Sequence, residues 1–152
     1  MDADLKHMER AYEQALLAFN EQEVPIGAVV VYENEVISEA HNKCIANCDP
    51  TAHAEIEAIR KAALEVGNYR LTGAMMYVTL EPCLMCCGAL IHSRFDKVIF
   101  ATEDIKSGAV VSNGNLLEAE FANHLVKFKR GPLQKESSDL LKKFFRDKRA
   151  KG

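Results

Sequence analysis

Residues 77–92 read YVTLEPCLMCCGALIH, and this stretch sets the first expectation about the fold. Its apolar start belongs to a strand predicted over 74–80. Pro82 lies at or near the first turn of a short helix predicted over 82–93, where a missing N–H costs little. A helix therefore follows a strand directly, and its first turns carry three cysteines, Cys83, Cys86 and Cys87.

The rest of the chain alternates between helical and strand patterns in the same way. Helices are predicted over 4–19, 52–67 and 134–151. Strands are predicted over 26–32, 34–42, 97–102 and 125–129, and the first two form a hairpin. Thr51 is the expected N-cap of the second helix, and Gly67 ends it. Interleaved strands and helices predict an α/β layered fold with a partly parallel sheet.

Composition limits the class of protein. The chain has 152 residues, 48% of them hydrophobic and 27% charged, which is ordinary for a globular domain. Without repeats or linkers, residues 1–152 are expected to form one domain. The charged N-terminus does not resemble a secretory signal, and no apolar run is long enough to cross a bilayer, so we expect a cytoplasmic protein with no membrane partner. Five cysteines, an odd number, argue against a disulfide framework.

Charge is distributed unevenly along the chain. Residues 127–152 contain ten basic and three acidic residues, a net charge of +7, whereas residues 1–126 carry −10. A basic end on an acidic body favours a polyanionic partner, although a solubilising terminal helix would have the same composition.

The stretch PTAHAEIEA (50–58) suggests a metal-binding role for the cysteines, because it places His53 and Glu55 at a helix start. Zinc binds imidazole nitrogen and thiolate sulfur, and a catalytic zinc uses three protein ligands. His53, Cys83 and Cys86 supply such a set, each near the start of a helix, where the partial positive charge favours thiolates.

Two other uses of these cysteines remain open at this point. A Cys-x-x-Cys pair is also typical of redox proteins. Cys44 and Cys48 could join Cys83 and Cys86 in a closed structural zinc site, but that arrangement leaves the His-Ala-Glu sequence at 53–55 without a purpose. Cys87 is interpreted as a small packing residue.

Glu55 favours a catalytic metal. It lies two residues from His53, so it can share the pocket without being a ligand. A carboxylate beside a zinc-activated water can move protons near neutral pH. The order His-x-Glu followed by Pro-Cys-x-x-Cys is typical of zinc-dependent base deaminases. The sequence therefore predicts a zinc deaminase site with Glu55 as its proton shuttle.

A resemblance narrows the substrate. The segments EVPIGAVVV, DPTAHAEIEAIR, NYRLTGAMMYVTLEPCLMCCGALIHSR, KSGAVVSNGNLL and LLKKFFRDKR resemble the bacterial tRNA-specific adenosine deaminases, over nearly the whole chain. That resemblance implies a three-layer α/β/α cytidine deaminase-like fold with a central five-stranded mixed sheet. It also implies a homodimer with one Zn²⁺ per subunit, bound by His53, Cys83 and Cys86.

The implied activity is hydrolytic deamination of the wobble adenosine, position 34, to inosine in the anticodon stem-loop of an arginine tRNA. The resemblance places Glu55 as the catalytic residue. It places nucleotide or RNA contacts at Asn42, Asp104, Lys106, Asn123, Phe144, Phe145 and Arg149, and we expect the backbone of Ala54 to orient the base. Phe144 and Phe145 could equally be core residues.

Four positions depart from the resemblance, namely Thr102, Glu103, Val111 and Leu125. Leu125 stands where the family usually has an Arg, and Glu103 adds a negative charge that the family usually lacks. Both changes would weaken a surface that faces phosphate groups. Two alternatives follow. The protein could be a small-molecule deaminase of guanine, cytosine or a nucleoside on the same fold, or a zinc-stabilised RNA-binding module without catalysis.

Overall fold

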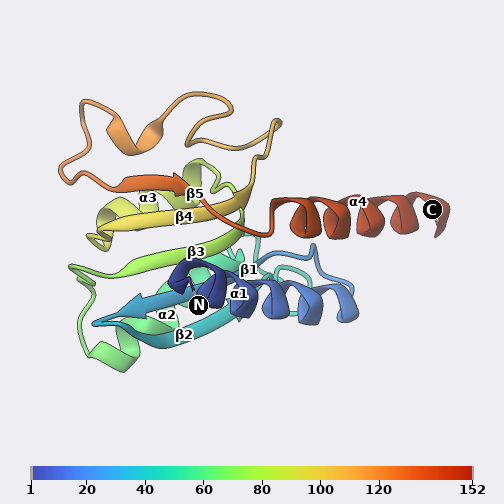
Figure 1. Cartoon of the computed structure of the whole chain (residues 1–152), viewed down its shortest axis with the longest axis horizontal. Helices are drawn as coiled ribbons and strands as arrows, with labels where there is room; N and C mark the ends of the chain where they lie inside the picture. Colours follow the sequence, from blue (N-terminus) through green and yellow to red (C-terminus); the bar gives the residue numbers. More distant parts are fainter. Residues whose placement is uncertain (1, 152) are drawn as a thin grey trace.

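The central layer of the computed structural model, which describes residues 2–151, is a five-stranded mixed sheet (Figure 1). Its strands are β1 (Gly27–Tyr32), β2 (Glu35–His41), β3 (Met75–Leu80), β4 (Lys97–Thr102) and β5 (Lys127–Arg130), arranged in the order β2-β1-β3-β4-β5. β1 is antiparallel to β2 and β3, whereas β3, β4 and β5 run parallel. The predicted partly parallel sheet is therefore confirmed.

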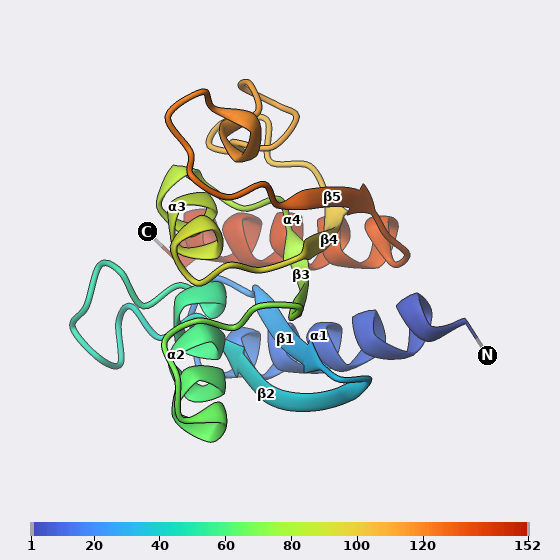
Figure 2. The same cartoon turned by 90° about the vertical axis from the view of Figure 1, so that its left-hand side faces the viewer.

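Two helices cover each face of the sheet. α2 (Ala54–Val66) and α3 (Leu84–His92) lie on one face, and α1 (Ala3–Asn20) and α4 (Gln134–Lys151) lie on the other (Figure 2). This confirms the predicted three-layer α/β/α architecture. A short 3-10 helix, η1 (Leu116–Glu118), follows β4 and was not predicted.

The side chains of each strand alternate between the two faces of the sheet, so a hydrophobic core lies on each face. In β1, Ala28 and Val30 pack in the cluster that includes the alanines of α2, whereas Val29 and Val31 pack with Met8 and Ala11 of α1. Successive side chains of a strand point to opposite faces, so one apolar run supplies both cores.

Gly27 lets α1 lie unusually close to the sheet. A Cβ at this position would overlap the carbonyl oxygen of Ala11 and the backbone nitrogen of Ala15. Ala11 and Ala15 are fully buried and are the small residues on the facing side of α1. The small-residue contact therefore fixes the distance between α1 and β1.

Helix and turn signals were mostly interpreted correctly. Gly67 ends α2 in the left-handed conformation, and Glu33 and Asn34 both have positive φ in the tight turn of the predicted hairpin. The expectation for Thr51 was wrong, because His53 is the N-cap of α2. Thr51 instead donates its N–H and its hydroxyl to Asp49 Oδ1, at 2.8 and 2.7 Å.

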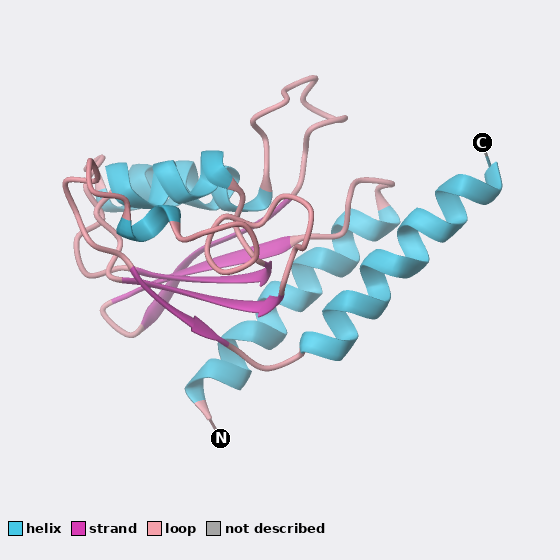
Figure 3. Cartoon of the chain, turned by 90° about the horizontal axis from the view of Figure 1, so that it is seen from above, coloured by secondary structure: helices cyan, strands magenta, loops and turns pink. Residues whose placement is uncertain are grey.

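The basic helix α4 lies beside α1, and its C-terminal end projects away from the sheet, past the ends of the strands (Figure 3). Its buried side chains are Ser137, Leu140 and Phe144, so only one narrow face is anchored. No helix within residues 2–151 is both long and apolar enough to cross a membrane.

Candidate metal centre and active site

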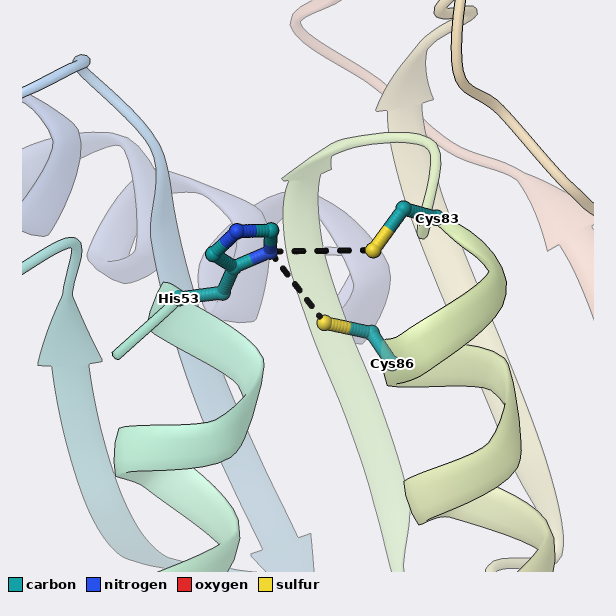
Figure 4. A group of neighbouring side chains, drawn as sticks. All are labelled: His53, Cys83 and Cys86. Atoms are coloured by element: carbon teal, nitrogen blue, oxygen red, sulfur yellow. Dashed lines mark hydrogen bonds between the residues drawn. The ribbon is translucent and has the colours of Figure 1, made fainter. Parts of the chain in front are cut away.

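Two helix starts bring the predicted metal ligands together. His53 is the N-cap of α2 and Cys83 is the N-cap of α3, and neither side chain caps its own helix. Both side chains are therefore free to face a common point, and Cys86 joins them from the first turn of α3 (Figure 4). The ligand atoms of all three lie within 4.8 Å of one another.

The spacing of these atoms fits a tetrahedral zinc ion. His53 Nδ1 lies 3.7 Å from Cys83 Sγ and 3.6 Å from Cys86 Sγ (Figure 4). Zinc bonds of about 2.0–2.1 Å to nitrogen and about 2.3 Å to sulfur, at tetrahedral angles, place such atoms about 3.6 Å apart. Three ligands also leave the fourth position open, as a catalytic zinc requires.

The two ligand cysteines differ in acidity. Hydrogen bonds from the Cys86 thiol and from His53 lower the pKa of Cys83 to about 4, even though burial opposes ionisation. The same contact and burial raise the pKa of Cys86. A bound cation would favour the thiolate form of both cysteines.

Glu55 lies at the base of the site, on the first turn of α2, with only 4% of its surface exposed. Burial raises its pKa to about 7, outweighing the hydrogen bond from its own backbone N–H, and the nearby Cys83 thiolate adds to the rise. A carboxyl group with this pKa can both accept and release a proton near neutral pH.

Asn42 is held in place by the helix that carries Glu55. Its Oδ1 accepts a hydrogen bond of 2.7 Å from the backbone N–H of Ala54, and both residues are buried. The N–H of Ala54 is thus engaged with Asn42 and fixes its carboxamide. Because the oxygen is occupied, the amide NH₂ group of Asn42 is the part best able to donate to a ligand.

A cavity of about 740 Å³ opens beside these residues. Eight of the predicted site residues line it, namely Asn42, His53, Glu55, Cys83, Asp104, Lys106, Phe145 and Arg149. It lies where β3 and β4 end, at Leu80 and Thr102, and one wall is α4. The structure thus brings together residues from five separate stretches of the chain.

The other four predicted residues do not line the cavity. Cys86 and Ala54 are fully buried behind the cavity surface. Phe144 is 8% exposed and packs edge-on against Phe19, at 6.2 Å between ring centroids. Asn123 is exposed outside the cavity, and its carbonyl accepts a hydrogen bond from Arg94.

Two of the sequence departures have structural explanations. Glu103 lines the cavity, but its carboxylate pairs with Arg130 at 2.9 Å, so its charge is compensated. Val111 makes its polar contact through its backbone N–H, which donates to Glu81, and this bond does not depend on the side chain. We find no structural rationale for Leu125, which is 59% exposed.

Sequence reasoning missed Glu81 and Lys142, which also line the cavity. Lys142 could have been found by helical spacing, because it lies one turn before Phe145 and two turns before Arg149 in the basic helix. Glu81 directly precedes Pro82 and is 2% exposed. Although burial opposes ionisation, hydrogen bonds from Ser112, Val111 and Asp104 hold the pKa of Glu81 below its usual value.

The remaining cysteines do not enter the metal cluster. Within residues 2–151, the group of neighbouring potential ligands contains His53, Cys83 and Cys86, and neither Cys44 nor Cys48. The alternative of a closed four-cysteine site is therefore not formed. Cys87 is fully buried, and its thiol faces the Pro82 carbonyl oxygen at 3.8 Å, consistent with a packing role.

Comparison with known proteins places this geometry in a family. Residues 1–102 match the family model for the cytidine and deoxycytidylate deaminase zinc-binding region. The tRNA-specific adenosine deaminase of Aquifex aeolicus (strain VF5) is 48% identical over 136 residues, covering 90% of this chain and 89% of that protein. The corresponding protein of Bacillus subtilis (strain 168) is 42% identical over 151 residues, covering 99% and 94%.

A solved structure agrees with the sequence relatives. It comes from a study of A-to-I editing by tRNA:A34 deaminases at the wobble position of transfer RNA. It superimposes with a TM-score of 0.87 at 38% identity and covers 90% of this chain and 99% of its own. The cytidine deaminase-like fold is thereby confirmed. The chain belongs to the tRNA-specific adenosine deaminases, within the wider family that shares the cytidine and deoxycytidylate deaminase zinc-binding region.

Proposed function

We propose that this protein hydrolytically deaminates the wobble adenosine of a tRNA anticodon loop to inosine, using one Zn²⁺ per subunit. The observation that carries the proposal is the His53–Cys83–Cys86 cluster beside buried Glu55, in a cavity walled by the basic helix α4. In the net reaction, the C6–N bond of adenine breaks, a C6–O bond forms from water, and ammonia leaves. The protein acts as one domain, residues 1–152.

The metal would be held by the three clustered side chains. Zinc, when bound there, supplies the Lewis acidity that brings the pKa of a water to about 7. The helix starts at His53 and Cys83 add partial positive charge, which favours the thiolate form of Cys83.

Glu55 moves the protons of this reaction. Its raised pKa, about 7, lets the carboxylate take a proton from water and deliver it to N1 of the adenine. The same carboxylate then takes the remaining water-derived proton from the new C6 hydroxyl and passes it to the amine, which leaves as ammonia. Burial of Glu55 keeps bulk water away from these transfers.

The other cavity residues bind and orient the RNA. Asn42, fixed through Ala54, donates from its amide group to the flipped nucleoside. Lys106, Lys142 and Arg149 supply positive charge around the opening, which suits phosphate groups. Phe145, 43% exposed, offers a ring face to an unstacked base, and an anticodon loop releases a base at low cost. The contact at Asn123 stays a prediction from the family.

An assay with defined RNA tests this function. Zinc-loaded protein is incubated with an arginine tRNA anticodon stem-loop bearing a wobble adenosine, and with free guanine, adenosine and cytidine in parallel. We expect inosine in the stem-loop and little turnover of the free compounds. A stem-loop with its adenosine moved to another loop position is the matched control. Turnover of a free base with an untouched stem-loop would assign the protein to small-molecule deamination, and zinc-dependent RNA binding without ammonia release would exclude catalysis.

We further propose a homodimer that works in the cytoplasm, as expected for a tRNA-modifying enzyme. Light scattering of the zinc-loaded protein would measure the mass directly. A monomer that retained full activity would contradict the dimer proposal.

A further inference from the structure

The loop that follows β4 carries predicted RNA contacts but has no regular structure of its own. Residues 104–112, called here the 104–112 loop, contain no helix or strand, and they present Asp104 and Lys106 to the cavity. Asp104 Oδ1 accepts the N–H groups of Lys106 and Ser107, which folds the loop locally. These bonds do not tie the loop to the metal site, so a fixed place relative to that site requires rigidity from outside the loop.

Glu81 supplies that rigidity. Its Oε2 accepts hydrogen bonds from three consecutive backbone N–H groups, those of Val110, Val111 and Ser112, at 3.0, 2.8 and 3.0 Å. Its Oε1 accepts from the Asp104 N–H at 3.0 Å and from the Ser112 hydroxyl at 2.5 Å. One carboxylate thus ties both ends of the 104–112 loop.

The packing around the carboxylate is as specific as its hydrogen bonds. Gly108 lies directly against it, and a Cβ at this position would overlap the carboxyl group of Glu81. The N–H of Ala109 donates to the carbonyl oxygen of Pro82 at 2.9 Å. The loop is therefore fitted to the two residues that immediately precede the metal ligand Cys83.

These contacts have a consequence for the reaction. We propose that Glu81 is a positioning residue, which fixes the 104–112 loop relative to the metal site and thereby sets where Asp104 and Lys106 meet the RNA. The proposal rests on the proposed function, because the contacts of this loop matter only if it borders the RNA. Glu81 itself touches neither substrate nor metal in this role.

The substitution Glu81→Gln tests the idea with little change in shape. Its amide NH₂ would face N–H groups that now donate to a carboxylate oxygen, so part of the loop would lose its anchor. We expect KM for the anticodon stem-loop to rise about tenfold, with kcat within about threefold of the wild type, because binding contacts rather than the chemical step are lost. Zinc content should remain at the wild-type level.

Glu23 provides a matched control. It is also a buried glutamate, 2% exposed, and it accepts the backbone N–H groups of Ile45 and Ala46 at 3.1 and 2.8 Å. Ile45 and Ala46 do not line the cavity, and Ile45 borders a separate hollow instead. Glu23→Gln should reduce stability in a similar way and leave KM unchanged.

Hydrogen exchange of the backbone amides gives a readout that does not depend on activity. In Glu81→Gln, we expect faster exchange at Val110, Val111 and Ser112, whereas Glu23→Gln should accelerate exchange at residues 45–46 only. If the wild type makes no inosine in the stem-loop, the proposed function fails, and this exchange comparison still decides whether Glu81 anchors the loop.

Four results would overturn the proposal. Loss of zinc or of kcat with unchanged KM would make Glu81 part of the metal site. An equal rise of KM in Glu23→Gln would indicate general destabilisation, and unchanged exchange at 110–112 would remove the anchor itself. If Glu81→Gln does not fold, Gly108→Ala displaces the loop with the carboxylate intact and should raise KM in the same way, with unchanged KM counting against the proposal.

Discussion

The carboxamide oxygen of Asn42 lies 2.7 Å from the backbone nitrogen of Ala54, so the start of the helix that carries Glu55 also orients Asn42. This bond joins the end of the hairpin to the helix that follows the candidate metal ligand His53. The side-chain oxygen of Asn42 therefore has a structural role, as the acceptor of the Ala54 N–H, while its amide NH₂ group can donate to a ligand.

Substitution of Asn42 can separate these two roles. Asn42→Ala should lower the free energy of unfolding by about 1–3 kcal/mol, because the buried N–H of Ala54 loses its acceptor. Asn42→Asp keeps an acceptor and loses the donor, so kcat/KM should fall about 10–100-fold with a smaller loss of stability. Urea unfolding and stem-loop kinetics measure both. Near-wild-type activity of Asn42→Asp would refute the donor role.

Glu55→Gln should abolish most activity and keep the metal. Removing a proton-transfer group typically costs about 10²–10⁴-fold in rate, and we expect a loss of kcat in that range. Glu57→Gln is the control, since Glu57 lies on the same helix but pairs with Asn47 and Arg60 instead of lining the cavity. Inosine formation and zinc content are measured together. Nearly full turnover by Glu55→Gln would show that the protons move by another route.

Adjacent cysteines should differ sharply in their effect on the metal. Cys86→Ser should lose most of the zinc and with it the activity, because Cys86 faces His53 Nδ1 at 3.6 Å. Cys87→Ser should keep the zinc, as should Cys44→Ser and Cys48→Ser. Atomic spectroscopy after dialysis against a weak chelator gives the zinc content. Loss of zinc from Cys44→Ser would instead support the four-cysteine site.

The two neighbouring phenylalanines of α4 should also behave differently. Phe144→Ala should lower the free energy of unfolding by about 3 kcal/mol, because it removes a buried ring that packs against Phe19. Phe145→Ala should leave stability nearly unchanged and raise KM for the stem-loop, since this ring lines the cavity. Thermal unfolding and steady-state kinetics distinguish the two. A KM effect confined to Phe144→Ala would reverse the assignment.

Acid should weaken a contact far from the active site. Asp4 accepts hydrogen bonds of 2.6 Å from both Lys129 and the Tyr77 hydroxyl, and although burial opposes ionisation, these bonds lower the pKa of Asp4. A lowered folded-state pKa contributes stability above the usual value of about 3.9, and this contribution is lost as the pH falls through the lowered value.

Asp4→Asn should therefore cost about 1–3 kcal/mol at pH 7, and the difference from the wild type should shrink below about pH 4. Urea unfolding at several pH values measures this difference. Asp139→Asn breaks an exposed pair with Lys135 and should change stability little at any pH. A difference for Asp4→Asn that stays constant from pH 7 to pH 3 would contradict this linkage.

Local sequence patterns were enough to predict the helices, the strands and the candidate metal-binding residues. Helical and strand periods are local, so the order of elements and the layered fold could be predicted from apolar spacing. Gly67 and the Glu33–Asn34 turn act within a few residues, and both predictions were confirmed. The spacing of His53, Glu55, Cys83 and Cys86 identified a cluster that the structure brings together, because each ligand lies at a helix start that follows from local signals.

Contacts between segments that lie far apart in the chain could not be predicted from local patterns. Glu81 binds N–H groups 23 to 31 residues further on, and Asn42 binds one 12 residues further on. Thr51 was mistaken for an N-cap: the cap is His53, two residues later, and the N–H and hydroxyl of Thr51 both donate to Asp49 Oδ1. Phe144 and Phe145 are adjacent and of the same residue type, so the sequence does not show which of them is buried. The packing of α4 buries Phe144 and exposes Phe145. Such contacts depend on how the helices pack against the sheet, and the local spacing of apolar residues carries no information about that packing.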